Sequence, residues 1–174
     1  MLGKNNNYKV LKIFLDSPIE NFRLREIARF SGISPPSVMN YLAEFIKEGL
    51  IKKNVKNEIP FYSAVRDSPN FILYKKLSIL FELNNSGLVE YLWEKLSPEV
   101  IILYGSFAKG ESIENSDIDL FILGEEKFLD LNKFEKRLNK NIHLFFKKSF
   151  KELALEIRNN ILNGIILKGY IKAF

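Results

Sequence analysis

The sequence contains no cysteine, so disulfide frameworks and zinc–thiolate sites are excluded. It contains no apolar run that approaches the roughly 20 residues needed by a membrane-spanning helix. No hydrophobic segment of the secretory kind is present either. We therefore expect a cytoplasmic protein that has no membrane partner.

A net charge is absent from most of the chain. Residues 67–174 contain 15 Lys and Arg and 15 Asp and Glu, whereas residues 1–66 contain 11 and 6, a net charge of +5. The whole formal excess of +5 therefore belongs to the first 66 residues. Such an asymmetry is expected of a segment that binds the phosphate backbone of a nucleic acid. The alternative is a basic surface that only keeps the protein soluble.

The length of 174 residues suits two small domains. We predict a first domain over residues 1–66, connecting helices over 67–97 and a second domain over 98–174. Within the connecting segment, apolar residues at helical spacing over 71–83 predict a helix, and a further helix is predicted over 88–96. The 71–83 helix is apolar over much of its circumference, so it packs against a core or, alternatively, forms a dimer contact.

Three helices are predicted in the first 47 residues. Apolar side chains recur at helical spacing over residues 8–15, 24–30 and 36–47. Gly32 follows the second helix, Ser34 is a candidate N-cap of the third, and Gly49 ends it. Helix, short helix, glycine turn and third helix together describe a helix-turn-helix.

Two strand-like runs, 50–55 and 61–65, follow the third helix and predict a β-hairpin. The polar residues 56–58 and then Ile59-Pro60 separate the two runs. The segment REIARFSGISPPSVMNYLAEFIKEGLI, residues 25–51, is similar to the winged helix-turn-helix of many bacterial and archaeal transcription regulators. This resemblance implies double-stranded DNA as a partner, although winged helices also serve as protein–protein adaptors.

The candidate DNA-binding residues fall into two groups. The polar side chains of the third helix that can reach major-groove base edges are Ser34, Ser37, Asn40 and Tyr41. The lysines of the hairpin that can contact phosphates are Lys52, Lys53 and Lys56, and Arg23, Arg25 and Arg29 add charge near the second helix. The third helix has no arginine, which leaves sequence-specific recognition open. Winged-helix proteins commonly bind two half-sites, so we expect a homodimer.

The most informative stretch, residues 100–123, reads VIILYGSFAKGESIENSDIDLFIL. Its continuous apolar start predicts a buried strand that ends at Gly105. Asp117 and Asp119 are two residues apart, so on a second strand both carboxylates lie on one face. Carboxylates that close repel each other unless a cation lies between them, and such oxygen ligands favour magnesium. Gly105 and Ser106 can bring backbone N–H groups and a hydroxyl to a phosphate.

Gly105-Ser106, ten intervening residues and then Asp117-Ile118-Asp119-Leu120 resemble the signature of the polymerase-beta-type nucleotidyltransferase superfamily. The form GSFAKG…SDIDL looks most like its minimal nucleotidyltransferases. With the hairpin pattern, this predicts an α/β (α+β) protein, in which an N-terminal winged helix-turn-helix precedes a nucleotidyltransferase-like mixed sheet with flanking helices. The alternative is a strand–turn–strand with a chance acidic pair.

The resemblance also implies roles for individual residues. A nucleoside triphosphate, as substrate or ligand, would be bound by Gly105, Ser106, Lys109 and Gly110. Mg²⁺ would be held by Asp117 and Asp119, and would bridge the phosphates and stabilise pyrophosphate as the leaving group. The candidate catalytic residues are Asp117, Asp119, Ser106 and His143.

His143 stands where the family normally has a third carboxylate, on a strand predicted over residues 141–146. It is the only histidine of the chain. Neutral imidazole is a poorer magnesium ligand than a carboxylate and adds no negative charge. His143 either acts as a general base near neutral pH or is merely hydrogen-bonded in its strand. Asp130 and Glu135 lie on a helix predicted over 128–138; they are expected to be solvated, and the alternative is that they approach the metals in another geometry.

Two functional hypotheses follow from these observations. In the first, the protein is an enzyme that transfers a nucleoside monophosphate, most simply AMP from ATP, to a protein or an RNA end. Minimal nucleotidyltransferases are often antitoxins paired with a small helical toxin, so the resemblance also implies a candidate toxin partner. In the second, the protein is a DNA-binding regulator whose nucleotidyltransferase domain has lost its chemistry and senses a nucleotide or dimerises.

Overall fold

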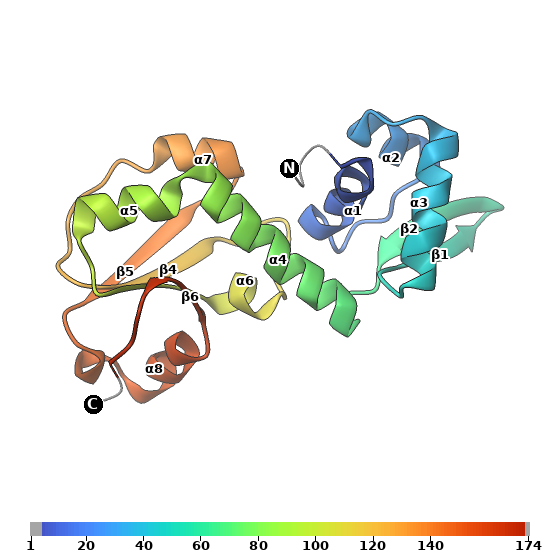
Figure 1. Ribbon diagram of the computed structural model, residues 1–174. Helices are drawn as coiled ribbons and strands as arrows, with labels where there is room; N and C mark the ends of the chain where they lie inside the picture. Colours follow the sequence, from blue (N-terminus) through green and yellow to red (C-terminus); the bar gives the residue numbers. More distant parts are fainter. Residues whose placement is uncertain (1–4, 173–174) are drawn as a thin grey trace. The chain divides into compact units, whose positions relative to one another are not determined.

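The computed structural model describes residues 5–172 (Figure 1). The chain divides into two compact units, residues 1–75 and 76–174. The predicted fold class is confirmed, because three helices and a hairpin come first and a mixed sheet with flanking helices follows. The predicted domains, 1–66, 67–97 and 98–174, stay predictions, and their first four and last two residues lie outside the described part of the chain.

The first unit is built from three helices and a two-stranded sheet. These elements are α1 (Asn6–Asp16), α2 (Leu24–Ser31), α3 (Pro35–Lys47), β1 (Ile51–Lys56) and β2 (Ile59–Ala64). Buried side chains from all three helices meet in one core, which includes Phe14, Ile27 and Leu42. Each helix buries most of the apolar face that its sequence periodicity predicts, although Ile46 of α3, which the periodicity places on that face, is 40% exposed.

The turn between α2 and α3 is determined by its glycine and prolines. Gly32 ends α2 with a φ of 69°, a left-handed conformation that glycine adopts without a steric penalty. Its N–H donates to the carbonyl of Ala28 at 3.0 Å. Ser34 is the N-cap residue of α3, and prolines occupy the first turn of that helix, where no backbone N–H is needed.

The hairpin of the first unit is slightly longer than the sequence prediction. β1 and β2 pair antiparallel, with Lys56 opposite Ile59, so the tip is formed by Asn57 and Glu58. Both tip residues have positive φ, as a two-residue hairpin turn requires. Ile59 and Pro60, which the prediction placed in the turn, therefore belong to β2. Proline is tolerated there because both strands are edge strands.

Two helices lie between the hairpin and the large sheet in the sequence. They are α4 (Pro69–Ser86) and α5 (Leu88–Leu96). α4 buries Phe71 in the core of the first unit and Ile79 and Leu83 in the core of the second. The helix predicted over residues 71–83 was expected either to pack against a core or to form a dimer contact. Its buried side chains pack in cores.

The second unit contains a four-stranded mixed sheet. Its strands are β3 (Val100–Tyr104), β4 (Ile118–Leu123), β5 (Ile142–Lys147) and β6 (Ile165–Gly169), in the order β5-β4-β3-β6. β3 runs antiparallel to β4 and β6, whereas β4 and β5 run parallel. A parallel pair needs a crossover connection, which contains α7 (Asn132–Leu138).

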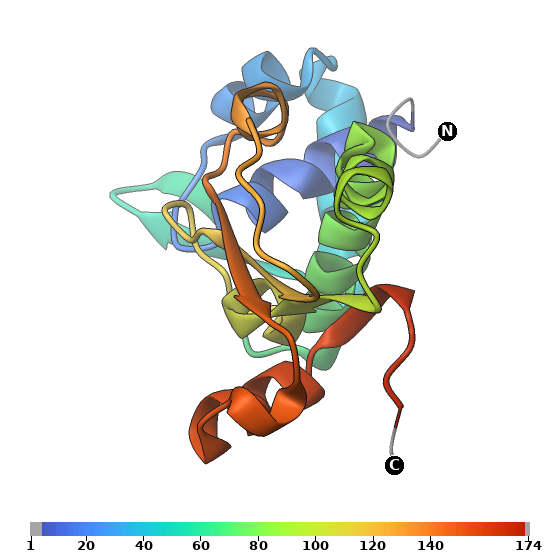
Figure 2. The ribbon, with the colours of Figure 1, turned by 90° about the vertical axis from the view of Figure 1, so that its left-hand side faces the viewer.

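Helices cover both faces of this sheet. On one face, Leu92 of α5 and Phe134 of α7 pack with sheet residues such as Leu120. On the other face, Ile161 of α8 (Leu155–Leu162) packs with Phe121. Figures 1 and 2 show α5 and α7 on one side of the strands and α8 on the opposite side. Successive side chains of β4 thus pack alternately into two separate apolar layers, one on each face of the sheet.

The structure departs from the predicted elements at two places in the second unit. A five-residue helix, α6 (Gly105–Lys109), follows β3 where a loop was predicted. α7 begins at Asn132 instead of residue 128, because the Asp130 carboxylate accepts the Asn132 N–H at 3.0 Å and Phe128 is fully exposed. A short 3₁₀ turn, η2 (Phe150–Glu152), also precedes α8. Within residues 5–172, no helix is long and apolar enough to cross a membrane.

Candidate functional site

Three neighbouring strands bring the candidate catalytic residues into one row. Tyr104, the last residue of β3, lies opposite Asp119 of β4, and Asp119 lies opposite His143 of β5. Residues directly opposite one another on adjacent strands project from the same face of a sheet. Asp117 precedes β4 by one residue rather than lying within it, a small departure from the predicted strand. We call Tyr104, Asp119 and His143, together with Asp117 just before β4, the row. The row places two carboxylates and the single imidazole close together.

The imidazole of His143 lies between the two carboxylates. Its Nε2 is 3.8 Å from Asp117 Oδ2, and its Nδ1 is 3.7 Å from Asp119 Oδ1. Both distances exceed hydrogen-bond length, so the contact is electrostatic rather than a fixed bond. The side chain of His143 is 62% exposed, whereas those of Asp117 and Asp119 are 35% and 30% exposed. His143 can therefore reach solvent or a substrate from this position.

The electrostatics of the row act mainly on Asp119. Burial raises the pKa of its carboxyl above the ordinary value, His143 lowers that pKa, and the charge of Asp117 raises it. Burial also raises the pKa of the neighbouring Tyr104 phenol, and the charge of Asp119 adds to this effect. A cation beside Asp119 would therefore stabilise the ionised form of its carboxyl.

Gly105 is required at the end of β3 for two separate reasons. Its φ is 72°, a left-handed conformation that residues with a Cβ rarely adopt. A Cβ added to it would lie 2.5 Å from Asp119 Oδ2. The absence of a side chain at this position therefore leaves the room that the Asp119 carboxylate occupies.

The remaining residues predicted to bind nucleotide belong to the short helix α6 and its end. Ser106 lies in the first turn, next to Gly105, and its carbonyl accepts the Glu111 N–H at 2.9 Å. Lys109 is exposed at the last position of the helix. Gly110 is buried and ends the helix with a φ of 76°, so its visible role is conformational. The nucleotide-binding roles of these residues stay predictions.

Asn141 is a site residue that the sequence analysis missed. Its side-chain Nδ2 donates to Asp117 Oδ1 at 2.8 Å. Such a bond orients the carboxylate and leaves Oδ2, the oxygen near His143, available for another partner. A signal was present in the sequence, because Asn141 precedes His143 by two residues and so points to the same face of the extended chain.

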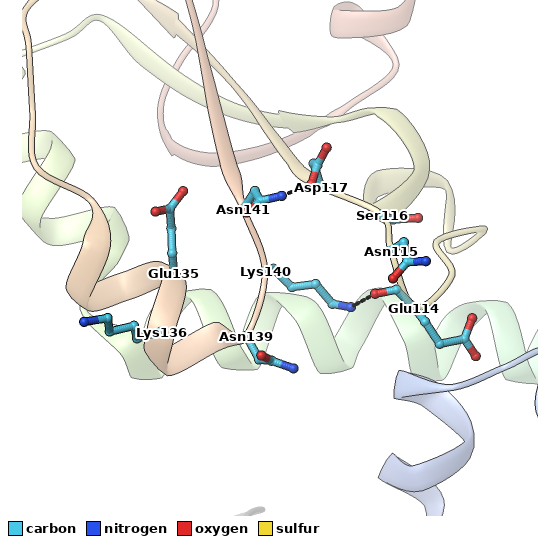
Figure 3. Close-up of a pocket in the computed structure, with 9 residues that line it drawn as sticks. All are labelled: Glu114, Asn115, Ser116, Asp117, Glu135, Lys136, Asn139, Lys140 and Asn141. Atoms are coloured by element: carbon cyan, nitrogen blue, oxygen red, sulfur yellow. Dashed lines mark hydrogen bonds between the residues drawn. The ribbon is translucent and has the colours of Figure 1, made fainter.

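A polar pocket of about 390 Å³ adjoins Asp117 (Figure 3). It is lined by Glu114, Asn115, Ser116, Asp117, Glu135, Lys136, Asn139, Lys140 and Asn141. Figure 3 shows Asn141 directed at Asp117, and Lys140 directed at the backbone carbonyl of Glu114. Glu135 accepts the Ile142 N–H at 3.0 Å, so this carboxylate supports the start of β5.

The carboxylates of the row suit one magnesium ion better than two. Mg²⁺ in phosphoryl-transfer sites is commonly bound by one or two carboxylates and completed by substrate phosphates and water. Asp117 and Asp119 provide such a pair of carboxylates, and burial raises the pKa of Asp119. No group of three or more His, Asp or Glu side chains placed to hold a metal ion occurs among residues 5–172.

The predicted DNA-binding residues of α3 differ in how free they are to contact a base. The Ser34 and Ser37 hydroxyl oxygens lie 3.0 Å apart and form a hydrogen bond with each other. Tyr41 is half-buried against the helical core. Asn40 is exposed. Of the four predicted residues, Asn40 thus has the side chain most available to DNA.

The cations of the first unit are mostly exposed. Lys52, Lys53 and Lys56 all lie exposed on β1. The guanidinium of Arg23 lies over the Phe61 ring of β2, 5.1 Å from the ring centroid. The hairpin lysines are thus free to contact phosphates, and Arg23 is held against the hairpin.

Two family models match the chain. One, described as polymerase beta nucleotidyltransferase, matches residues 87–171. The other, described as winged helix-turn-helix DNA-binding, matches residues 23–52. The first range contains the whole Tyr104–Asp119–His143 row and Gly105, and the second contains α2 and α3.

No curated protein matches the chain. One solved structure, described as "Crystal structure of the toxin-antitoxin with AMP-PNP", is 21% identical, and the match covers 49% of this chain and 74% of that chain. Its TM-score is 0.38, and a likeness at this level carries no argument about the present chain.

Proposed function

Because residues 87–171 match a polymerase beta nucleotidyltransferase family and residues 23–52 a winged helix-turn-helix DNA-binding family, we propose that this protein is a DNA-binding nucleotidyltransferase. It transfers a nucleoside monophosphate, AMP from ATP, to a macromolecular acceptor. The observation that carries the proposal is the geometry around Gly105, where two carboxylates, an imidazole and the Gly-Ser turn come together. A protein or an RNA end as acceptor, a toxin-like protein partner, a homodimer and a cytoplasmic location belong to the same proposal.

The residues of the site have separate binding roles. Asp117 and Asp119 would hold Mg²⁺, which would supply positive charge to the phosphates and to the leaving pyrophosphate. Asn141 keeps the Asp117 carboxylate oriented through its hydrogen bond at 2.8 Å. Ser106 and the adjoining backbone N–H groups bind the triphosphate, and Gly105 lets them approach it closely.

The reaction forms one bond and breaks one. The oxygen of an acceptor hydroxyl bonds to the α-phosphorus, the bond from that phosphorus to the bridging oxygen of the β-phosphate breaks, and pyrophosphate leaves. The hydroxyl proton passes to the imidazole of His143, which is exposed and lies 3.7–3.8 Å from both carboxylates.

A second candidate function is supported by His143 itself. With an imidazole at the third position, residues 5–172 offer only two carboxylates to a metal in this row. A site of this composition suits nucleotide binding without turnover. The protein would then be a DNA-binding regulator that senses a nucleotide.

Label transfer from α-labelled nucleotides, together with pyrophosphate release, tests the proposed chemistry. The full chain is incubated with Mg²⁺ and each nucleotide, with cell extract as the source of acceptor, and Asp117→Asn serves as the inactive control. We expect Mg²⁺-dependent transfer that is absent in the variant. Absence of transfer with nucleotide binding retained would overturn the enzyme proposal and favour the regulator.

A further inference from the structure

The surface of α3 opposite the core of the first unit has an unusual composition. Val38, Leu42 and Phe45 are buried. At 100° per residue, the face directly opposite these three is occupied by Pro36, Asn40, Ala43 and Lys47. All four are exposed, as is Met39 beside them, at 54% exposure. We call these five residues the outer face of α3.

Most of the outer face lacks charge. Its one cation, Lys47, is the last residue of the helix, and no arginine occurs in α3. Glu44, at the margin of the face, accepts a hydrogen bond from the Asn7 side chain at 3.2 Å. The Ser34 and Ser37 hydroxyls are engaged with each other. Asn40 is left as the uncharged polar side chain among the five, with Ala43 about 60° and Met39 about 100° to one side of it around the helix axis.

The composition of the outer face favours some base pairs over others. Guanine is most often read by arginine or lysine, whereas the asparagine amide pairs with adenine N6 and N7. Apolar side chains contact the C5-methyl group of thymine. A recognition helix enters the major groove with its first turns against the base edges, where Pro36, Met39, Asn40 and Ala43 lie. The outer face therefore matches A·T pairs and offers guanine no arginine.

We propose that the outer face of α3 recognises A·T base pairs in the major groove, with Asn40 on adenine and Met39 and Ala43 against thymine methyl groups. The proposal rests on the proposed DNA binding and is independent of the nucleotidyltransferase chemistry. Lys52 and Lys53 of β1 and Arg25 of α2 supply phosphate contacts that carry no base preference.

Selection from a pool of randomised DNA duplexes tests the preference with the full chain. We expect the duplexes that the protein retains to be enriched in A·T pairs at the contacted positions. Enrichment in G·C pairs, or equal retention of all sequences, would overturn the preference and leave DNA binding intact. Failure to retain any duplex would overturn DNA binding together with the preference.

Base analogues then assign the contacts within one selected duplex, at a single salt concentration. Replacing adenine by 7-deazaadenine removes N7, one of the two partners of the asparagine amide, and we expect affinity to fall by about fivefold, the lower end of the range for a bidentate contact. Replacing thymine by uracil removes only the methyl group, and a smaller loss is expected. Affinity that is unchanged by both analogues would overturn the assigned contacts.

Two variants connect these losses to residues. Asn40→Ala should bind the unmodified duplex more weakly and become insensitive to 7-deazaadenine, while Met39→Ala should become less sensitive to uracil. Asn159→Ala, an exposed helical asparagine outside the winged helix, is the matched control and should behave as the wild type. An Asn40→Ala variant that remains as sensitive to 7-deazaadenine as the wild type would refute the role of Asn40.

Discussion

The two units carry function in opposite ways. The first unit, residues 1–75, has a net charge of +5, and its hairpin lysines are exposed and separate. The second unit, residues 76–174, has no net charge, and its candidate site depends on one row across three strands in which Asp119 and His143 lie directly opposite. Affinity for phosphates adds up over many contacts, whereas phosphoryl transfer depends on a few atoms at fixed distances. A single substitution should therefore lower DNA affinity only slightly in the first unit, whereas a single substitution in the row should abolish most of the transfer activity of the second.

The largest difference between the units should come from Asp119→Asn. The variant loses a metal-binding carboxylate, so turnover should fall by on the order of 10³, the equivalent of several kcal/mol of transition-state stabilisation. DNA affinity should stay within about twofold, because no residue of the first unit is altered. Turnover and duplex binding are measured on the same preparation, with Glu126→Gln, an exposed carboxylate of the second unit, as the control. Turnover by Asp119→Asn at the wild-type rate would refute the metal role.

Gly105→Ala should be the next most damaging change. The new Cβ would lie 2.5 Å from Asp119 Oδ2 in a backbone with a φ of 72°, so the carboxylate must move. We expect turnover to fall by about 100-fold, the size of effect that small misplacements produce. Gly87→Ala is a matched control, because Gly87 has a φ of 79° and no atom within 4 Å of an added Cβ. Equal losses in the two variants would show that backbone strain, not displacement of Asp119, is responsible.

Asn141→Ala should have an intermediate effect. It removes the hydrogen bond to Asp117 Oδ1 and leaves both carboxylates in place. Loss of such a supporting residue typically costs roughly 10- to 100-fold in metal affinity or activity. The concentration of Mg²⁺ needed for half-maximal activity is the measurement, and Asn115→Ala, in the same pocket, is the control. If both variants need the same Mg²⁺ concentration as the wild type, Asn141 has no supporting role.

In the first unit, Lys52→Ala combined with Lys53→Ala should act gradually. Each lysine that contacts a phosphate contributes about 0.9 to the slope of log affinity against log salt, so the slope should fall by about two. Nucleotidyl transfer should be unaffected. Lys127→Ala with Lys151→Ala, two exposed lysines of the second unit, should leave the slope unchanged. A slope that both double variants alter equally would place the phosphate contacts elsewhere.

The smallest expected effect concerns stability. Burial raises the pKa of Asp119, so the folded state favours the protonated carboxyl. Stability from this group is therefore present at low pH and lost as pH rises from the ordinary Asp value of 3.8 through the raised folded value. Asp119→Asn should remove this loss and melt slightly above the wild type at neutral pH, with no difference well below pH 3.8. Thermal unfolding scans without Mg²⁺ over this pH range measure it, and an equal difference at every pH would contradict it.

The second unit shows where sequence patterns were sufficient and where they were not. β3 is a continuous apolar run that ends at Gly105, and both ends agree with the prediction. α6 was missed because five residues, GSFAK, are too few for helical periodicity to appear. Asn141 was missed because its partner, Asp117, is 24 residues away and meets it only through strand pairing.

The first unit was easier to predict at its core than at its surface. Buried side chains of α1, α2 and α3 follow the 3.6-residue period, which is a local property of the sequence. The pairing of the Ser34 and Ser37 hydroxyls and the burial of Tyr41 depend on neighbouring atoms. Polarity alone therefore named four candidates on α3, and the structure leaves Asn40 as the most available of them.

The register between β4 and β5 has an evolutionary consequence. Because His143 lies opposite Asp119 and is 62% exposed, a smaller side chain fits at residue 143 without a change of backbone or neighbour. Histidine and aspartate codons differ by a single base, so one point mutation converts imidazole to carboxylate in either direction. A lineage can thus cross between a two-carboxylate and a three-carboxylate row in one step. His143→Asp would recreate that step in the laboratory.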